Sequence, residues 1–354
     1  MTEYLQEILK QFSLRGTPVT SVCNKKGHIN ESYMVTTDCN CSYILQRVND
    51  TVFKDVDGLM RNIEVITDFL QSKEPDTRAV LQLVKTVDGK PYLRHTDATV
   101  WRVYVFVADA ICLQAPETPE DFYQSAVAFG RFQQMLRDFP AETLTETIPN
   151  FHNTKDRYRQ FYEVLQKDPM GRAKDVQAEI DFARKREKEA GILVDLLEAG
   201  KLPLRVTHND TKLSNVMLDA RTRTALCVID LDTVMPGSSL YDYGDSIRFG
   251  AATGAEDAPD AQQVNLDLNL FETYTRGFLS ACPDLTPEEV DLLPMGAKIM
   301  TLECGLRFLT DYLDGDHYFA CSRPGQNLDR CRTQFHMVMD MENKWEQMHH
   351  FVIF

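Results

Sequence analysis

The hydrophobic pattern of the chain before residue 109 differs from the pattern that follows. Runs rich in β-branched and aromatic residues, bounded by turn-forming residues, predict strands at residues 32–37, 42–48, 80–87 and 100–107. Apolar residues recur at helical spacing over residues 56–70. We therefore expect this part of the chain to form a sheet with one inserted helix.

Beyond residue 109 the period becomes that of amphipathic helices. Apolar positions predict helices over residues 119–139, 155–167, 177–199, 264–282, 288–313 and 328–349. An unlike segment, residues 205–248, is expected to hold two short strands and Asp-rich loops. The whole pattern predicts an α+β protein with a small, mostly antiparallel β-rich lobe at residues 1–107 and a larger helical lobe at residues 108–354.

The composition is globular, and its charge argues against two classes of partner. Of the 354 residues 43% are hydrophobic, and 53 acidic against 38 basic residues give a formal charge of −15. Proteins that bind nucleic acids or anionic membranes by charge need clustered Lys and Arg. We expect neither nucleic acid nor a membrane as a partner.

The apolar runs, the N-terminus and the cysteines of the sequence indicate the cellular compartment. No apolar run approaches the roughly 18 residues of a membrane span, and the N-terminus lacks the layout of a signal peptide. The nine cysteines are scattered without a CxxC pair, which favours free, buried thiols over disulfides or a zinc site. We therefore expect a cytoplasmic protein.

Candidate chemistry is concentrated at residues 207–218 and 228–232. The first segment holds His208, Asp210 and Asn215 in a His-x-Asp-x₄-Asn pattern, and the second is an apolar strand that ends at Asp230. Phosphoryl transfer needs a carboxylate beside the attacking hydroxyl, plus an amide and a second carboxylate that hold Mg²⁺. The alternative is structural, with one Asp capping a turn and the other closing a strand. The order Asp, Asn, Asp after a strand-rich lobe favours the kinase-type interpretation.

These segments, together with residues 229–237 and 241–250, resemble the aminoglycoside phosphotransferase and choline kinase superfamily of kinase-like enzymes. The likeness extends over nearly the whole chain. The variants at residues 209–213 and 230–237 are most similar to members that phosphorylate the anomeric hydroxyl of N-acetylglucosamine or N-acetylgalactosamine. The resemblance implies a two-lobed protein-kinase-like fold, a hinge at about residues 102–109, and ATP, Mg²⁺ and an N-acetylhexosamine as ligands.

Two other functions stay open at this point. One is a kinase of the same superfamily that acts on another sugar, a choline-like amine or an aminoglycoside. The other is a non-catalytic nucleotide-binding regulator, which loss of the base or of a metal ligand would favour. Asp210, Asn215 and Asp230 are all present in this sequence.

The resemblance implies roles for the residues of the loop. Asp210 would be the general base or the carboxylate that orients the hydroxyl, and His208 would support its loop. Asn215 and Asp230 would ligate Mg²⁺ through oxygen atoms. Lys212 would reach the transferred phosphoryl group, unless it is simply a solvated lysine.

The sugar pocket is expected around the metal loops and a C-terminal helix. Asp242 and Asp245 are expected to brace the loops through backbone N–H groups. Each candidate contact to the sugar has a plain helix-surface or core contact as its alternative. The candidates for substrate binding are Arg307, Tyr318, Arg248, Thr233 and Asp232.

In the first lobe the resemblance implies contacts to the nucleotide. Gly27 and Asn30 resemble the loop that covers the nucleotide, where backbone N–H groups approach phosphate. The hinge would pair with adenine through backbone groups, which makes Tyr104 and Phe106 nucleotide-binding candidates.

One position departs from the kinase pattern. Glu64 lies where kinases keep the glutamate that orients a strand lysine, yet Gln46 occupies the lysine position and Arg47 follows it. Successive residues of a strand face opposite sides, so both cannot enter the cleft without a bulge. We take Arg47 as the candidate cation for the ATP phosphates, with Gln46 as the alternative.

Overall fold

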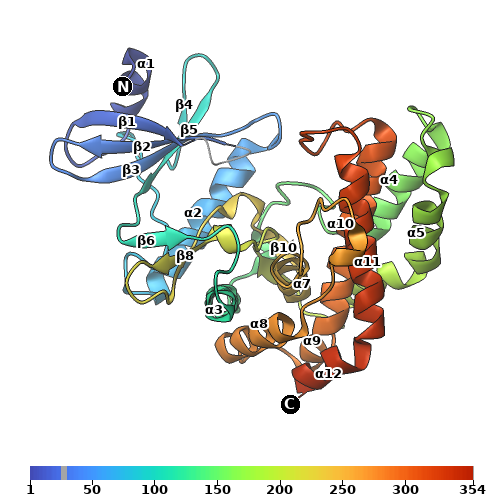
Figure 1. Ribbon diagram of the computed structural model, residues 1–354. Coiled ribbons are helices and arrows are strands. Elements are labelled where there is room, and N and C mark those ends of the chain that lie inside the picture. The colour runs from blue at the N-terminus through green and yellow to red at the C-terminus, as the bar shows by residue number, and fades with distance from the viewer. Residues whose placement is uncertain (25–29, 354) are drawn as a thin grey trace.

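A five-stranded antiparallel sheet forms the upper part of the molecule (Figure 1). The computed structural model describes residues 1–24 and 30–353, so Gly27 lies outside the described residues. The strand order is β1-β2-β3-β5-β4. The strands are β1 (Pro18–Asn24), β2 (Glu31–Thr37), β3 (Ser42–Arg47), β4 (Leu93–Arg94) and β5 (Val100–Val105).

Each face of this sheet is covered by a different helix. Tyr43 and Leu45 of β3 pack with α1 (Glu3–Leu9) on the outer face. Ile44, on the opposite face, packs toward α2 (Val56–Lys73). This alternation follows from the two-residue period of a strand, and it decides which side chains face the second lobe.

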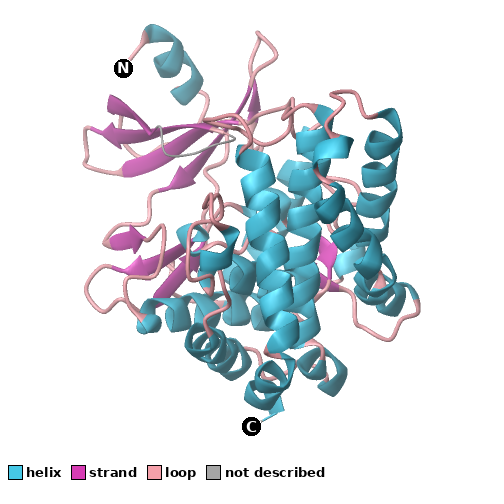
Figure 2. Ribbon diagram, turned by 45° about the vertical axis from the view of Figure 1, so that its right-hand side comes forward, coloured by secondary structure: helices cyan, strands magenta, loops and turns pink. Residues whose placement is uncertain are grey.

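The remaining chain is mainly helical, and its helices stand side by side in Figure 2. Helix α10 packs against α7, α11 and α4. The helices are α3 (Pro119–Met135), α4 (Thr154–Lys167), α5 (Gln177–Ala190), α6 (Ile192–Glu198), α7 (Ser239–Gly250), α8 (Leu268–Ala281), α9 (Pro287–Asp291), α10 (Leu293–Asp314), α11 (Gln326–Asn343) and α12 (Trp345–Ile353).

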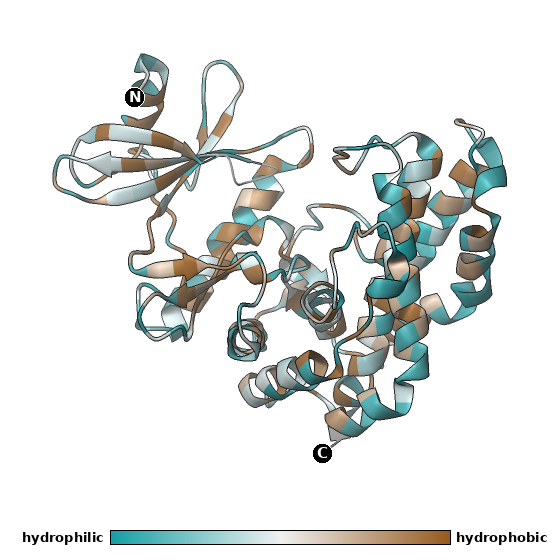
Figure 3. Cartoon of the chain, in the orientation of Figure 1, coloured by the Kyte–Doolittle hydropathy of each residue, from teal (hydrophilic) through white to brown (hydrophobic). Residues whose placement is uncertain are grey.

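Two small antiparallel sheets lie between the large sheet and the helices, and they carry the loops of interest. One pairs β7 (Arg205–Thr207) with β10 (Met235–Gly237), and the other has the order β6-β8-β9. Buried Leu59 and Ile63 of α2 share one core cluster with Phe132 of α3 and Leu231. Figure 3 shows hydrophobic residues gathered where α2 meets these strands. The strands of the second small sheet are β6 (Ala110–Cys112), β8 (Val216–Asp219) and β9 (Ala225–Val228).

The fold class is confirmed, with an antiparallel sheet in the N-terminal lobe and a helical C-terminal lobe. The exact boundary at residue 107 stays a prediction. Three local predictions were wrong. Residues 80–87 make only isolated bridges, between Leu83 and Tyr104 and between Thr86 and Phe12, instead of a strand. The expected Asp-rich loops contain a helix, α7, and the expected helix over 177–199 is divided at Gly191.

All nine thiols are free, but the expectation that they are buried was wrong for several of them. Four are exposed, namely Cys23, Cys39, Cys112 and Cys321. None of the helices in residues 1–24 and 30–353 combines the length and the apolar character that crossing a membrane requires.

Candidate active site

The loop after β7 is held in a strained conformation by one buried carboxylate. Asn209 has φ of 65°, a left-handed conformation that costs free energy for any residue with a side chain. Asp242, at the start of α7, accepts the backbone N–H of His208 at 2.9 Å and of Asn209 at 2.7 Å. Gln133 donates to the same carboxylate at 2.6 Å. The buried Asp242 therefore fixes the backbone immediately before Asp210.

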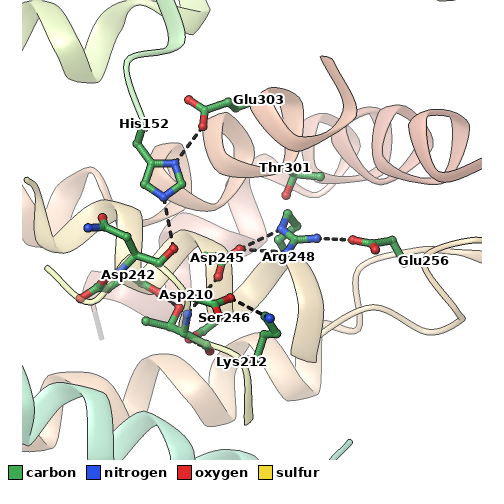
Figure 4. A network of polar contacts seen from close by, with 12 residues as sticks. His152, Asp210, Lys212, Asp242, Asp245, Ser246, Arg248, Glu256, Thr301 and Glu303 are labelled. Carbon is green, nitrogen blue, oxygen red and sulfur yellow. Dashed lines mark hydrogen bonds and ion pairs between the residues drawn. The ribbon is translucent and has the colours of Figure 1, made fainter. Parts of the chain in front are cut away.

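A second carboxylate of α7 holds the next residue of the loop. Asp245 accepts the backbone N–H of Thr211 at 3.0 Å. Burial would raise the pKa of Asp245, but the Arg248 guanidinium outweighs this effect and lowers the pKa. Arg248 is itself buried and also donates to Glu256 at 2.5 Å (Figure 4). Because its donors face these two carboxylates, the placement argues against the sugar contact predicted for Arg248.

Asp210 lies among three polar partners. His208 Nε2 is 2.9 Å from the Ile229 carbonyl oxygen, so this nitrogen carries the proton and Nδ1 accepts the Asp210 N–H at 3.3 Å. The Asn215 amide donates to the Asp210 carboxylate at 3.0 Å. Lys212 Nζ is 3.0 Å from the other carboxylate oxygen, as Figure 4 shows. Burial opposes the charge on Lys212, but Asp210 outweighs it and raises the pKa of the ammonium group.

Asp230 has the properties expected of a cation ligand. Its side chain is reached by solvent, yet it lies among protein atoms and near Asp232 and Asp210. This partial dehydration, and then the two neighbouring carboxylates, raise the pKa of Asp230 to about 6. No group in the described part of the chain donates a hydrogen bond to it. A divalent cation would replace the missing donors and favour the charged carboxylate, so the site fits Mg²⁺.

The remaining metal candidate lies beside Asp230. The Asn215 carbonyl oxygen accepts the Ile229 N–H at 2.9 Å, which brings Asn215 next to the strand that ends at Asp230. The Asn215 amide nitrogen faces Asp210, which leaves its side-chain oxygen for a cation. Among the described residues no cluster of three His, Cys, Asp or Glu side chains forms a ready metal site. A cation held here would therefore depend on Asn215, Asp230 and oxygen atoms of a ligand.

A buried ion pair joins the first lobe to the loop after β9, which carries Asp230 and Asp232. Arg102 of β5 contacts Asp232 through two nitrogens, at 2.5 and 3.0 Å, and the two side chains are 1% and 4% exposed. Asn30, a predicted nucleotide contact, donates to the same carboxylate at 2.5 Å. Both oxygens of Asp232 are thus taken by protein donors, which argues against the substrate contact predicted for this residue.

The prediction that Arg47, and not Gln46, faces the cleft was wrong. Gln46 shares the inner face of the sheet with Arg102, whose Nε donates to the Gln46 oxygen at 2.9 Å. Arg47 is exposed on the other face, with Glu31 at 3.9 Å. Arg102, which the sequence assigned only to the hinge, is the cation on the inner face. Glu64 does pair with a lysine, but this is Lys85 and not a residue of β3.

The two hinge candidates are placed differently. Tyr104 is buried in the cluster between the lobes, and its ring lies 5.3 Å from the Arg102 guanidinium. Phe106 is half-buried and donates its backbone N–H to the Ser42 carbonyl oxygen at 3.1 Å. Their contacts with adenine stay predictions.

Among the sugar candidates, Arg307 and Tyr318 are brought together. The Arg307 guanidinium lies 5.2 to 5.6 Å from the ring centres of Phe151, Tyr318 and Phe319. Tyr318 is 66% exposed. Thr233 is buried, and its hydroxyl donates to the His208 carbonyl oxygen at 2.7 Å, so it supports the loop. Arg307 and Tyr318 therefore stay the accessible candidates.

Several residues of this region were not found from the sequence. His152 contacts Glu303 at 2.8 Å and the Asn209 carbonyl oxygen at 3.4 Å. Arg102 and Gln133 also reach the loops from distant segments. No local spacing connects these residues. A signal was available only for Arg102, a charged residue inside an apolar strand pattern, which is rarely buried without a partner.

Replacing Gly244 with Ala is expected to destabilise the protein and to lower its activity. A Cβ at this position of α7 would collide with the backbone oxygen of Gly296 in α10, and backbone cannot yield like a side chain. We expect a loss of about 1–3 kcal/mol in the free energy of unfolding, measured in urea. Gly191→Ala is the control, because its Cβ would meet only side-chain atoms, those of the flexible Lys155 and of Asp195. Equal stability of the two variants would contradict the tight contact of α7 and α10.

The two-lobed fold and a loop carrying Asp210, Lys212 and Asn215 beside Asp230 define a kinase-like phosphotransferase. Residues 24–277 match the phosphotransferase enzyme family, APH, and the chain belongs to this family.

Solved structures agree on the fold. The chain is similar to an aminoglycoside phosphotransferase from Alicyclobacillus acidocaldarius, with a TM-score of 0.66, 16% identity, and coverage of 98% of this chain and 96% of that one. A choline kinase from Cryptosporidium parvum matches with a TM-score of 0.60, 11% identity and coverage of 98% and 97%. Amicoumacin kinase in complex with AMP-PNP and Ca²⁺ matches with a TM-score of 0.58, 12% identity and coverage of 96% and 92%.

Proposed function

We propose that the protein is an N-acetylhexosamine 1-kinase, which transfers the γ-phosphoryl group of ATP to the anomeric hydroxyl of N-acetylglucosamine or N-acetylgalactosamine. One observation supports phosphoryl transfer. Asp210, Lys212 and Asn215 lie together beside Asp230, whose carboxylate accepts no hydrogen bond from the described residues. The family supports a small-molecule acceptor. The motif variants at residues 209–213 and 230–237 support the amino-sugar acceptor.

In this proposal Asp210 accepts a hydrogen bond from the anomeric hydroxyl and directs it toward the γ-phosphate. An anomeric hydroxyl is more acidic than an ordinary alcohol, so orientation contributes more than proton removal. Lys212 holds the Asp210 carboxylate and places a positive charge where negative charge develops. Asn215 and Asp230 would hold Mg²⁺, which neutralises charge on the phosphates.

The nucleotide is proposed to lie between the lobes, against the hinge at about residues 102–109. Amicoumacin kinase, a structural neighbour, binds AMP-PNP together with a divalent cation. In this chain Arg102 and Asp232 neutralise each other, so Arg102 has no free charge for the phosphates. Its role in the proposal is to hold the metal loop against the sheet.

The sugar is proposed to contact Arg307 and Tyr318. Arg307 lies on α10, one turn after Glu303, which contacts His152 beside the catalytic loop. The aromatic rings around Arg307 offer an apolar surface for an acetamide methyl group, and its guanidinium can donate to ring hydroxyls or to the acetyl oxygen. This arrangement suits a neutral sugar better than a cationic amine, which the Arg307 charge would repel.

The proposal is tested by incubating the protein with Mg²⁺ and ATP and a panel of acceptors, followed by ³¹P NMR of the products. The panel holds N-acetylhexosamines, the free hexosamines and hexoses, choline, ethanolamine and aminoglycosides. Phosphate coupled to an anomeric proton of an N-acetylhexosamine supports the proposal. Phosphate on C6 or on an amino alcohol, with no reaction at C1, would show a different kinase of the family.

Arg307→Ala is expected to raise the KM for the sugar by about tenfold or more, since a charged hydrogen bond of roughly 1.5–3 kcal/mol is lost. The KM for ATP should stay within twofold, because Arg307 lies on the sugar side. Arg332→Ala is the matched control, because this Arg of α11 pairs with Glu179 on the far surface. Steady-state kinetics with each substrate varied give both KM values. A rise in the KM for ATP alone would show that Arg307 contacts the nucleotide and not the sugar.

Mg²⁺ binding is expected to weaken as the pH falls below about 6. The pKa of Asp230 is raised to about 6, so the protonated form dominates below that pH, and each bound cation must displace a proton. The apparent affinity should be constant above this pH and fall by about tenfold per pH unit below it. Titration calorimetry in the presence of AMP-PNP measures the dependence. Asp230→Asn should bind weakly with no such dependence, and a wild-type affinity that does not change with pH would contradict the assignment.

A further inference from the structure

The peptide that joins Asn209 to Asp210 is contacted by a histidine at each of its two ends. At its N–H end, the Asp210 nitrogen donates to His208 Nδ1 at 3.3 Å. At its C=O end, the Asn209 oxygen lies 3.4 Å from Nε2 of His152, a residue that comes from the segment before α4 (Figure 4). The orientation of this peptide sets the direction in which the Asp210 side chain leaves the backbone. His152 is therefore placed to control Asp210 without touching it.

His152 has a possible hydrogen-bond acceptor beside each of its two ring nitrogens. Nδ1 lies 2.8 Å from a Glu303 carboxylate oxygen, and the other oxygen of Glu303 accepts the Thr154 hydroxyl at 2.6 Å. Burial would raise the pKa of Glu303, but His152 outweighs this effect and lowers the pKa, so Glu303 is ionised. Nε2 faces a backbone carbonyl, which can only accept. A hydrogen bond between Nε2 and the Asn209 carbonyl therefore requires a hydrogen on Nε2.

The surroundings hold the His152 ring and its carboxylate partner in the interior. His152 is 8% exposed and Glu303 is 1% exposed. The Tyr241 ring lies 5.3 Å from the His152 ring. Arg157 of α4 and Arg307 of α10 also favour the charged form of Glu303. A buried, ionised carboxylate is costly to build, and hydrophobic packing alone would not require it.

We propose that His152 is a positioning residue for the phosphoryl transfer, which donates from Nε2 to the Asn209 carbonyl and so holds the peptide that aims Asp210. Glu303 contacts Nδ1 of His152 and links the ring to α10. This inference rests on the proposed function, because it assigns His152 to the reaction of the same loop. The strained φ of 65° at Asn209 gives this peptide a reason to need support at both ends.

Two nearly isosteric substitutions separate the two contacts of the ring. The amide nitrogen of Gln replaces Nε2, so His152→Gln keeps a donor toward the Asn209 carbonyl and loses the contact with Glu303. The amide nitrogen of Asn replaces Nδ1, so His152→Asn keeps the contact with Glu303 and loses the Asn209 contact. We expect kcat to fall by roughly 10- to 100-fold in His152→Asn with both KM values within twofold, since small misplacements of reacting groups have effects of this size. His152→Gln should retain kcat within about threefold although it unfolds more easily.

The result that would overturn the proposal is unchanged kcat in His152→Asn, or an equal loss of kcat in both variants. Circular dichroism and calorimetric binding of ATP show that each variant is folded. Ring ¹⁵N spectra of the full chain, assigned through the missing signal of His152→Asn, show without any substrate whether Nε2 carries a hydrogen, and an Nε2 without a hydrogen would also overturn the proposal. If the wild-type protein phosphorylates none of the acceptors, the proposed function is wrong, but the ¹⁵N result on His152 is unaffected.

Discussion

Asp210→Asn is expected to lower kcat by about 10²- to 10⁴-fold, the range found when a group that orients or deprotonates a hydroxyl is removed. The amide keeps the size of the carboxylate, but one oxygen acceptor near Lys212 becomes a donor that repels it. The hydroxyl then loses the acceptor that directs it. Steady-state kinetics with the N-acetylhexosamine that gives the highest wild-type rate measure the effect. The KM for ATP should change little, because Asp210 faces the acceptor.

The controls for this substitution concern folding and charge. Asp210 is only partly buried, so urea unfolding of Asp210→Asn should give a free energy within about 1 kcal/mol of wild type. Asp181→Asn, on the exposed surface of α5, makes the same chemical change far from the site and should have wild-type kcat. Near-wild-type turnover of Asp210→Asn would remove Asp210 from the reaction.

The sequence predicted most helices because their exposed side is polar and their buried side is apolar. Helix α7 was missed because it has no exposed polar side opposite a buried apolar side. Nearly all of its residues are buried, and the polar ones, such as Asp242 and Asp245, are buried with partners. In a helix that is covered on every side, a polar residue does not mark a solvent-facing side, and the carboxylates look like those of a loop. The same burial is what allows α7 to hold the backbone of residues 208–211.

The candidate site divides in a similar way. Asp210 and Asn215 are five residues apart, and their closeness follows from local spacing. Arg102 and Asp232 are separated by 130 residues, and His152 and Glu303 by 151, so only the tertiary fold brings each pair together. These long-range pairs are the part of the site that a single sequence cannot supply.

The choice between Gln46 and Arg47 shows where local reasoning ends. Strand alternation correctly required that one of them faces inward and the other outward. Which one faces inward depends on the neighbouring strand, where Arg102 lies opposite Gln46. A second cation beside Arg102 would be repelled, and a glutamine can accept its hydrogen bond. The inward charge is therefore present, but it comes from β5 and is neutralised by Asp232.

Asp232→Ala is expected to destabilise the protein by about 3–5 kcal/mol, because it leaves the Arg102 guanidinium buried without its carboxylate. Arg102 is 1% exposed, and its other hydrogen-bond partners, Gln46 and Met60, carry no charge. Burial opposes the charge on Arg102, while Asp232 raises its pKa, so the arginine cannot escape the cost by losing its proton. Urea unfolding measures the loss. Glu163→Gln, in an exposed ion pair with Arg159, is the control and should cost less than about 1 kcal/mol.

The double variant Arg102→Met with Asp232→Leu separates the ion pair from the packing. Replacing both charges removes the unpaired cation, so it should recover most of the stability lost in Asp232→Ala. The single variant also changes the metal site. Asp232 helps to raise the pKa of Asp230 and Arg102 lowers it, so removing the carboxylate alone should lower that pKa below 6 and extend Mg²⁺ binding to more acidic solution. A loss of stability below 1 kcal/mol in Asp232→Ala, or an unchanged pH dependence of Mg²⁺ binding, would mean that the pair does not couple the first lobe to the loop that carries Asp230.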